Sequence, residues 1–296
     1  MKQACGSLRA ACRLPIPPPT SGPCSPTSPR RRPTAPAFIH GERTLSFAEL
    51  LDCSARAPQG LADLGVGPGD RVALWLPNVP AYPILYFACA RLGAIAVAVN
   101  TRYRAVEVAD IVGRSGAKVL ACAPGFRRID FLSILADIEP AALDRLAAIV
   151  IVGDEPASVP PAIEQLRARA VRPPAVAAGR SPPTTRSASA PCNIFTTSGT
   201  TSAPKFVLHR QGAIAGHAQQ VARTFGFTAP ETLSLADPAA VRRLRLQPDA
   251  GDARRRQAVA CWSRSYEIDE IARLIAQHKP TTMFGSDDMY AAPARA

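Results

Sequence analysis

Between residues 71 and 152 the sequence alternates short apolar runs with segments of helical character, and this alternation limits the fold more than any other feature. Helices are predicted between the apolar runs. Strands that alternate with helices form a mostly parallel sheet with helices on both faces, which explains why the strand runs are apolar throughout. The sequence therefore predicts an α/β fold with strands at 71–76, 94–99, 118–123 and 147–152 and helices at 79–92, 104–115 and 126–137.

The text before this region predicts a hairpin and a helix. AFIH and RTLSF flank the turn residues Gly41 and Glu42, a pattern typical of two short paired strands. Ser46 and Glu49 have the spacing of a capping box, which opens a helix that runs towards Leu64. Pro58 falls inside that helix and is expected to kink it or break it.

A second patterned region begins near residue 191. CNIFTT and KFVLH read as strands, residues 211–224 as a helix and TTMFG as a further strand. YEIDEIARLIAQH places Ile268, Ile271 and Ile275 on one face of a helix.

Three segments have no periodicity, and they hold the excess positive charge. The formal net charge is +12: residues 1–36 carry +6, residues 164–190 and 237–264 carry +4 each, and the rest of the chain carries about −2. These cations have only Trp262 among them, not the series of interleaved aromatic residues that a base-stacking surface requires, so we expect no nucleic-acid partner. We expect residues 1–36 to be a disordered Pro/Arg-rich segment and residues 155–190 and 237–263 to be irregular inserts in a domain that covers 37–296.

Eight cysteines are scattered along the chain without a C-x-x-C pair. Such scatter argues against a zinc site and against a disulfide scaffold, and we expect most of the thiols to be buried and reduced. The N-terminus lacks an uninterrupted apolar core, and the apolar stretch 79–99 is broken by Pro80, Pro83, Arg91 and Gly93. We expect no membrane span and a cytoplasmic location.

Residues 196–205 read TTSGTTSAPK. A loop of small hydroxyl residues around one glycine, leaving a strand, can direct N–H and O–H groups at an anion, and a nearby lysine suits phosphate oxygens. The segment is not a Walker A loop, because Pro204 precedes the lysine and Phe206 follows it. A polar linker that binds nothing has the same composition, so the residues alone leave both interpretations open.

The stretch IFTTSGTTSAPK resembles, from Ile194 to Lys205, the phosphate-loop signature of the adenylate-forming (AMP-binding) superfamily. LADLGVGPGDRVALWLPN and ACARLGAIAVAVNTRYRAVEVADIV are similar to the start of the large domain of such enzymes, and PKFVLHRQGAIAGHA is most like the acyl-CoA synthetase branch. The resemblance covers roughly 37–153, 191–233 and 265–290, and it implies an incomplete N-terminal large domain.

This resemblance implies a two-step reaction, in which a carboxylic acid attacks the α-phosphate of Mg²⁺-bound ATP and coenzyme A then takes the acyl group. It implies that the β- and γ-phosphates are held by Thr197, Ser198, Gly199, Thr200 and Thr201, with Lys205 nearby and Thr196 at the flank. The partner it implies is a small carboxylic acid. We assign no catalytic residue and no metal ligand, and His209 stays open between a site near the acyl pocket and an ordinary strand-end position.

The sequence also departs from the family pattern. The Tyr-Gly-x-Thr-Glu stretch whose glutamate helps to hold magnesium, the aspartate for the ribose hydroxyls, the hinge and the lysine of the C-terminal lid domain are not found in it. We therefore expect a truncated chain that lacks the lid domain and is inactive alone. The alternative is a non-catalytic remnant or binding protein of the same ancestry. The Arg/Pro/Ala-rich interludes also suggest out-of-frame translation, which the reading frames around codons 234–265 would test.

Overall fold

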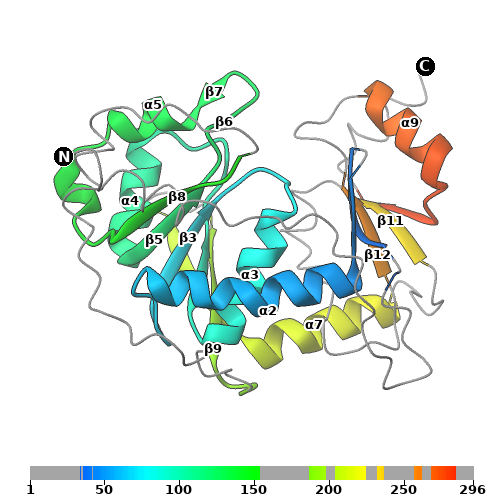
Figure 1. Cartoon of the computed structure of the whole chain (residues 1–296), viewed down its shortest axis with the longest axis horizontal. Coiled ribbons are helices and arrows are strands. Elements are labelled where there is room, and N and C mark those ends of the chain that lie inside the picture. Colours follow the sequence, from blue (N-terminus) through cyan, green and yellow to red (C-terminus); the bar gives the residue numbers. More distant parts are fainter. Residues whose placement is uncertain are drawn as a thin grey trace. The chain divides into compact units, whose positions relative to one another are not determined.

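A computed structural model describes residues 34, 36–41, 43–153, 187–197, 204–224, 232–236, 257–261 and 268–284. The described residues belong to two compact units, one built on a six-stranded sheet and the other on a five-stranded sheet. Figure 1 labels their helices and strands.

The six-stranded sheet confirms the α/β prediction. Its strand order is β10-β9-β4-β3-β5-β8, and every neighbouring pair is parallel except β9 and β10. The chain moves from β3 to β4 on one side and then crosses back over β3 to reach β5, which is a doubly wound arrangement. The strands are β3 (Arg71–Trp75), β4 (Ile95–Ala98), β5 (Ala117–Cys122), β8 (Ala148–Ile151), β9 (Pro191–Thr197) and β10 (Lys205–Arg210).

Helices α3 (Ala81–Leu92) and α4 (Ala105–Ser115) make these two crossovers. Because parallel crossovers are right-handed and these two run in opposite directions along the sheet, the helices cover opposite faces; Figure 1 draws β3 and β5 between them. The middle of the sheet is therefore excluded from solvent: Val72, Ala73 and Leu74 of β3 are fully buried.

The helix predicted at 126–137 is shorter than expected. The first turn of the predicted helix is replaced by a small hairpin of β6 (Gly125–Phe126) and β7 (Ile129–Asp130). Helix α5 covers only Phe131–Ala136. Arg127 turns the hairpin with a left-handed φ of 57°. The Asp130 carboxylate then caps α5 by accepting hydrogen bonds from Leu132 N and Ser133 N at 2.9 and 3.1 Å, and bonding to Ser133 lowers the pKa of that carboxyl.

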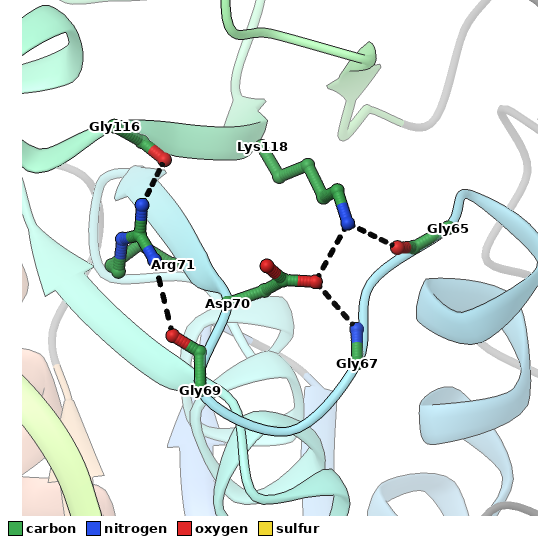
Figure 2. A network of polar contacts seen from close by, with 7 residues as sticks. All are labelled: Gly65, Gly67, Gly69, Asp70, Arg71, Gly116 and Lys118. Carbon is green, nitrogen blue, oxygen red and sulfur yellow. Dashed lines mark hydrogen bonds and ion pairs between the residues drawn. The ribbon is translucent and has the colours of Figure 1, made fainter.

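A polar network fixes the amino ends of β3 and β5 (Figure 2). Lys118 Nζ donates to Asp70 Oδ2 and to Gly65 O, each at 2.8 Å, and the same Asp70 oxygen accepts from Gly67 N at 2.8 Å. The Arg71 guanidinium donates to Gly69 O at 3.2 Å and to Gly116 O at 2.9 Å. GVGPGD is therefore a loop with its own hydrogen-bond partners.

Gly116 ends α4 in the left-handed region, with φ 60° and ψ 40°. A Cβ at this position would lie 2.7 Å from Arg71 Nη2. Only glycine accepts this conformation without strain and leaves room for the guanidinium.

The N-terminal hairpin and capping box are confirmed. β1 (Pro36–His40) pairs antiparallel with β2 (Arg43–Ser46), and Ser46 N donates to Glu49 Oε2 at 2.7 Å while Glu49 N donates to Ser46 Oγ at 3.2 Å. At Pro58 the sequence predicted a kink or a break; the break is wrong, because α2 runs without interruption over Phe47–Asp63. Its buried positions, at Leu50, Cys53, Ala57 and Leu61, lie on both sides of the proline and hold the helix across it.

The five-stranded sheet has the order β13-β11-β12-β1-β2, with β1 and β2 the one antiparallel pair. Strand β12 (Gln257–Cys261) lies inside the segment 237–263, so the expectation that this segment is irregular is wrong for those five residues. Its neighbours β11 and β1 both pair with it in parallel. The rest of 237–263 lies outside the described residues, as do residues 1–33 and 154–186.

Strand β11 (Thr232–Ala236) was not predicted, whereas β13 (Thr282–Phe284) and the helices α7 (Gln211–Thr224) and α9 (Ile268–His278) were. On α9 the buried positions are Ile271 and Leu274, while Ile268 and Ile275 are 39% and 38% exposed. In the described part of the chain, no helix is long and apolar enough to cross a membrane.

Candidate functional site

The carboxyl ends of the parallel strands meet at one edge of the six-stranded sheet, and this edge is where such sheets bind ligands. The ends of β3 and β4 are tied together there. Val99 N donates to Leu74 O at 3.1 Å, and Trp75 Nε1 donates to Asn100 O at 3.1 Å. Asn100 Oδ1 accepts from Arg102 N at 3.0 Å and turns the chain away from the sheet.

The predicted phosphate-binding segment begins at the same edge. Thr196 and Thr197 are the last residues of β9, and Lys205 is the first residue of β10. Lys205 lies directly opposite Thr197 in the antiparallel pair, and Phe206 lies opposite Thr196. Since opposite residues share a face and successive residues alternate, Thr197 and Lys205 lie on one face of the hairpin and Thr196 and Phe206 on the other.

This arrangement separates the predicted site residues into two groups. Lys205 and Thr197, both exposed, are brought together. Thr196 is half-buried and lies on the opposite face. The remaining predicted residues, Ser198, Gly199, Thr200 and Thr201, fall outside the described residues.

A cation that sequence reasoning missed contacts the start of β10. Arg114, in the last turn of α4, donates from Nη2 to Pro204 O at 2.8 Å, and its guanidinium lies 4.5 Å from the centroid of the Phe206 ring. Asp110, one turn earlier, binds it through two hydrogen bonds of 2.6 and 2.7 Å. The hydrogen bond to Asp110 raises the pKa of Arg114 above its ordinary value. The i,i+4 pair can be read from the sequence, but its contact with a residue 90 positions later cannot.

Asn193 is the second residue that sequence reasoning did not single out. It lies in β9 between Ala96 of β4 and His209 of β10, and it is 1% exposed. Neither Oδ1 nor Nδ2 of its side chain has a hydrogen-bond partner in the described structure. A buried amide without partners destabilises the fold, because folding removes it from water without replacing its hydrogen bonds.

Asn193→Val is therefore expected to raise the free energy of unfolding by about 1–2 kcal/mol, because it removes the unpaired amide and places a β-branched residue in a strand. Urea unfolding followed by circular dichroism measures the change. Asn100→Val is the matched control, and it should lower stability by about 0.5–1.5 kcal/mol since it loses the hydrogen bond from Arg102 N. A loss of stability in Asn193→Val would show that the amide is paired in solution.

His209 and the described cysteines have structural surroundings. His209 is half-buried in β10 and meets Phe195 edge-on, with ring centroids 5.4 Å apart. The four described cysteines outside the masked segments and β12, namely Cys53, Cys89, Cys122 and Cys192, are buried and form no disulfide, in agreement with the expectation that most of the thiols are buried and reduced. Burial raises the pKa of Cys89 and of Cys122 to about 12, so neither is a nucleophile near neutral pH.

The arrangement at this edge suits an anion. An exposed ammonium and an exposed hydroxyl face the same side where a strand ends, and neither faces an acidic partner in β9 or β10. Within the ranges that the structure describes, no group of three or more His, Cys, Asp or Glu could hold a metal ion. The residues present therefore fit phosphate oxygens, while no described group of carboxylates marks a place for Mg²⁺.

These features define a doubly wound α/β protein in which an exposed lysine and an exposed threonine lie opposite each other at the carboxyl edge of the sheet. The sequence model of the AMP-binding enzyme family matches residues 26–292, so the chain belongs to this family and the predicted resemblance is confirmed.

The relatives named here are ligases that join acids to coenzyme A. Long-chain-fatty-acid–CoA ligase FadD13 of Mycobacterium tuberculosis is 32% identical over 197 residues, which cover 66% of this chain and 35% of that protein. The 4-hydroxybenzoate–CoA/benzoate–CoA ligase of Rhodopseudomonas palustris is 29% identical over 263 residues, which cover 86% of this chain and 45% of that protein. The chain thus spans less than half the length of these two relatives.

Solved structures show the same fold. The N-terminal domain of FACL13 from Mycobacterium tuberculosis matches with a TM-score of 0.64 and 25% identity, over 91% of this chain and 62% of that one. O-succinylbenzoate coenzyme A synthetase from Bacillus subtilis, in complex with AMP, matches with a TM-score of 0.64 and 20% identity, over 88% of this chain and 48% of that one.

Proposed function

We propose that this chain provides the phosphate-binding part of an AMP-forming acid–CoA ligase, with ATP, a carboxylic acid and coenzyme A as substrates. The observation that carries the proposal is the pairing of Lys205 with Thr197, which gives a cation and a hydroxyl the same direction at the two ends of the Ser/Thr/Gly segment. The family to which the chain belongs and the ligase names of its relatives support it.

In the proposed reaction a substrate carboxylate oxygen attacks the α-phosphorus of ATP, and the bond to the bridging oxygen breaks to release pyrophosphate. Negative charge grows on the leaving pyrophosphate. The Lys205 ammonium neutralises part of this charge, and the Thr197 hydroxyl donates to a phosphate oxygen, so both stabilise the leaving group without a covalent step. The thiol of coenzyme A then displaces AMP from the acyl group.

We propose that Ser198, Gly199, Thr200 and Thr201 donate to the β- and γ-phosphates, as the resemblance implies. Mg²⁺ would neutralise further phosphate charge when bound, and we assign no residue of this chain to it. For the acid we propose only its chemical class, a carboxylic acid, because the relatives described above are named for acids as different as long-chain fatty acids and benzoate.

We further propose that this chain does not catalyse adenylation alone. It spans 35% of FadD13, and the glutamate, aspartate and lysine that the resemblance calls for are not found in the sequence. The alternative of a non-catalytic binding protein is less well supported, since the named relatives are ligases.

Acid-dependent exchange of labelled pyrophosphate into ATP tests this proposal, because the exchange requires reversible formation of an acyl-adenylate. With fatty, aromatic and short-chain acids at millimolar concentration, we expect exchange no faster than in the absence of acid. Full-length FadD13 serves as the positive control for the assay. Acid-dependent exchange by the 296-residue chain would overturn the statement that it is insufficient, and would identify its substrate class at the same time.

A further inference from the structure

The first residues of β10 are held from outside their own sheet by Arg114 of α4. Three contacts fix the guanidinium: its edge meets the Asp110 carboxylate, Nη2 reaches Pro204 O, and its face covers the Phe206 ring. Although the Arg114 side chain is 43% exposed, it contacts three different groups: a carboxylate, a backbone carbonyl and an aromatic ring. A planar guanidinium can satisfy all three together, whereas an ammonium cannot.

Lys205 is the residue between the two that Arg114 contacts. Holding the Pro204 carbonyl fixes the peptide plane before Lys205, and holding the Phe206 ring fixes the residue after it. Phe206 points to the face that Arg114 covers, so Lys205 points to the opposite face, where Thr197 lies.

The contacts from Arg114 stabilise a part of the sheet that has few hydrogen bonds of its own. Among the described strands β10 is at the edge of the sheet and pairs with β9 alone. The first residue of an edge strand next to a proline has few hydrogen bonds of its own, because proline provides no N–H. Such an end frays unless a side chain from another element holds it.

We propose that Arg114 is a positioning residue for Lys205, and that it keeps the lysine on the phosphate-binding face by holding Pro204 and Phe206. This inference rests on the proposed function, since it assigns Lys205 to the phosphates of ATP. We expect no direct contact of Arg114 with the nucleotide, because its Nε and Nη2 donate to Asp110 and Pro204 and its ring contact with Phe206 lies on the face of the hairpin opposite to Lys205.

Two measurements on the whole chain test the inference. The first is deuterium uptake of the segment 204–210, which reports the order of β10 without any ligand. The second is an ATP titration followed by amide chemical shifts, which reports affinity into the millimolar range. Circular dichroism checks that each variant is folded.

Arg114→Ala is expected to speed deuterium uptake in 204–210 and to weaken ATP binding about tenfold, the equivalent of one lost charge-assisted interaction. Arg114→Lys should have nearly the same effect, because lysine keeps the charge but not the three contacts. Asp110→Asn should act in the same direction and less strongly. Arg128→Ala is the matched control: it removes one exposed cation from a turn and should change neither measurement.

A double-substituted variant separates positioning from direct attraction. In the Lys205→Ala background, Arg114→Ala should weaken ATP binding by less than about twofold, because Arg114 has no further target when the lysine is gone. Additive effects, full rescue by Arg114→Lys, or unchanged deuterium uptake in Arg114→Ala would each overturn the inference. If Lys205→Ala leaves ATP binding unchanged while Arg114→Ala still speeds uptake, the support of β10 is real and the proposed function is what fails.

Discussion

Trp75→Ala is expected to lower the free energy of unfolding by about 3–5 kcal/mol, the range for truncating a large buried aromatic residue. Trp75 and Phe131 are both fully buried and stacked, with ring centroids 4.0 Å apart and an interplanar angle of 8°. The alanine variant loses the stack, leaves a cavity beside Phe131, and removes the hydrogen bond from Nε1 to Asn100 O. That bond ties the ends of β3 and β4 at the edge of the candidate site, so the substitution is expected to affect both the core and this edge.

Urea unfolding followed by far-UV circular dichroism measures this effect. Trp75→Phe keeps an aromatic ring and loses the N–H donor, so its cost should be smaller, about 1–2 kcal/mol. Val106→Ala is the matched control for removing apolar atoms: Val106 is 80% exposed on α4, and its change should stay within about 0.5 kcal/mol. A loss in Trp75→Ala no larger than that of Val106→Ala would mean that the stacked pair contributes little to the core.

The strands of the six-stranded sheet could be predicted because each is a short apolar run between turn signals. β3, β4, β5 and β8 begin and end within two residues of the predicted bounds. A strand that is buried on both faces reads as a continuous apolar run, whichever strands lie beside it. The strand order β10-β9-β4-β3-β5-β8 could not be predicted in this way, because the pairing of distant strands is a property of the assembled sheet.

The errors have identifiable physical causes. At 126–137 the apolar period predicted one helix, but the left-handed Arg127 and the cap Asp130 divide the segment into a hairpin and a shorter helix. At Pro58 a local rule predicted a kink or a break, but the helix is not broken there and has buried positions on both sides of the proline. At β12 the surrounding Arg/Pro-rich sequence obscured five residues that pair with β11 on one side and with β1 on the other.

The candidate site was predictable in part. Thr197 and Lys205 stand in one continuous motif, so their proximity follows from the sequence. That Thr196 lies on the other face follows only once the register of the hairpin is known. The contact of Arg114 with Pro204 and the buried, unpaired amide of Asn193 depend on which segments pack together in the fold. No pattern along the chain predicts either of them.

Lys205→Ala should weaken ATP binding by about 10- to 100-fold. A hydrogen bond to a charged group contributes about 1.5–3 kcal/mol, and each 1.4 kcal/mol is a factor of ten in the dissociation constant. The affinity of the unmodified chain is expected to be no better than about millimolar, because the adenine and ribose partners that the resemblance implies are not found in its sequence. The substitution should leave the fold intact, since Lys205 is exposed and lies at the end of an edge strand.

Titration of ATP against the whole chain, followed by amide chemical shifts at two salt concentrations, measures the effect of this substitution. Arg210→Ala is the matched control, because Arg210 is an exposed cation at the other end of the same strand, about 17 Å away at 3.4 Å per residue. If Lys205 meets phosphate directly, its removal should reduce both the affinity and the salt dependence, whereas removal of Arg210 should change the affinity less than about twofold. Lys205→Arg should recover part of the loss, because it restores the charge with a different donor geometry. Equal effects of the two alanine substitutions would reduce the role of Lys205 to general attraction by positive charge. Micromolar binding that survives Lys205→Ala would place the nucleotide elsewhere in the chain and remove the hairpin from the site.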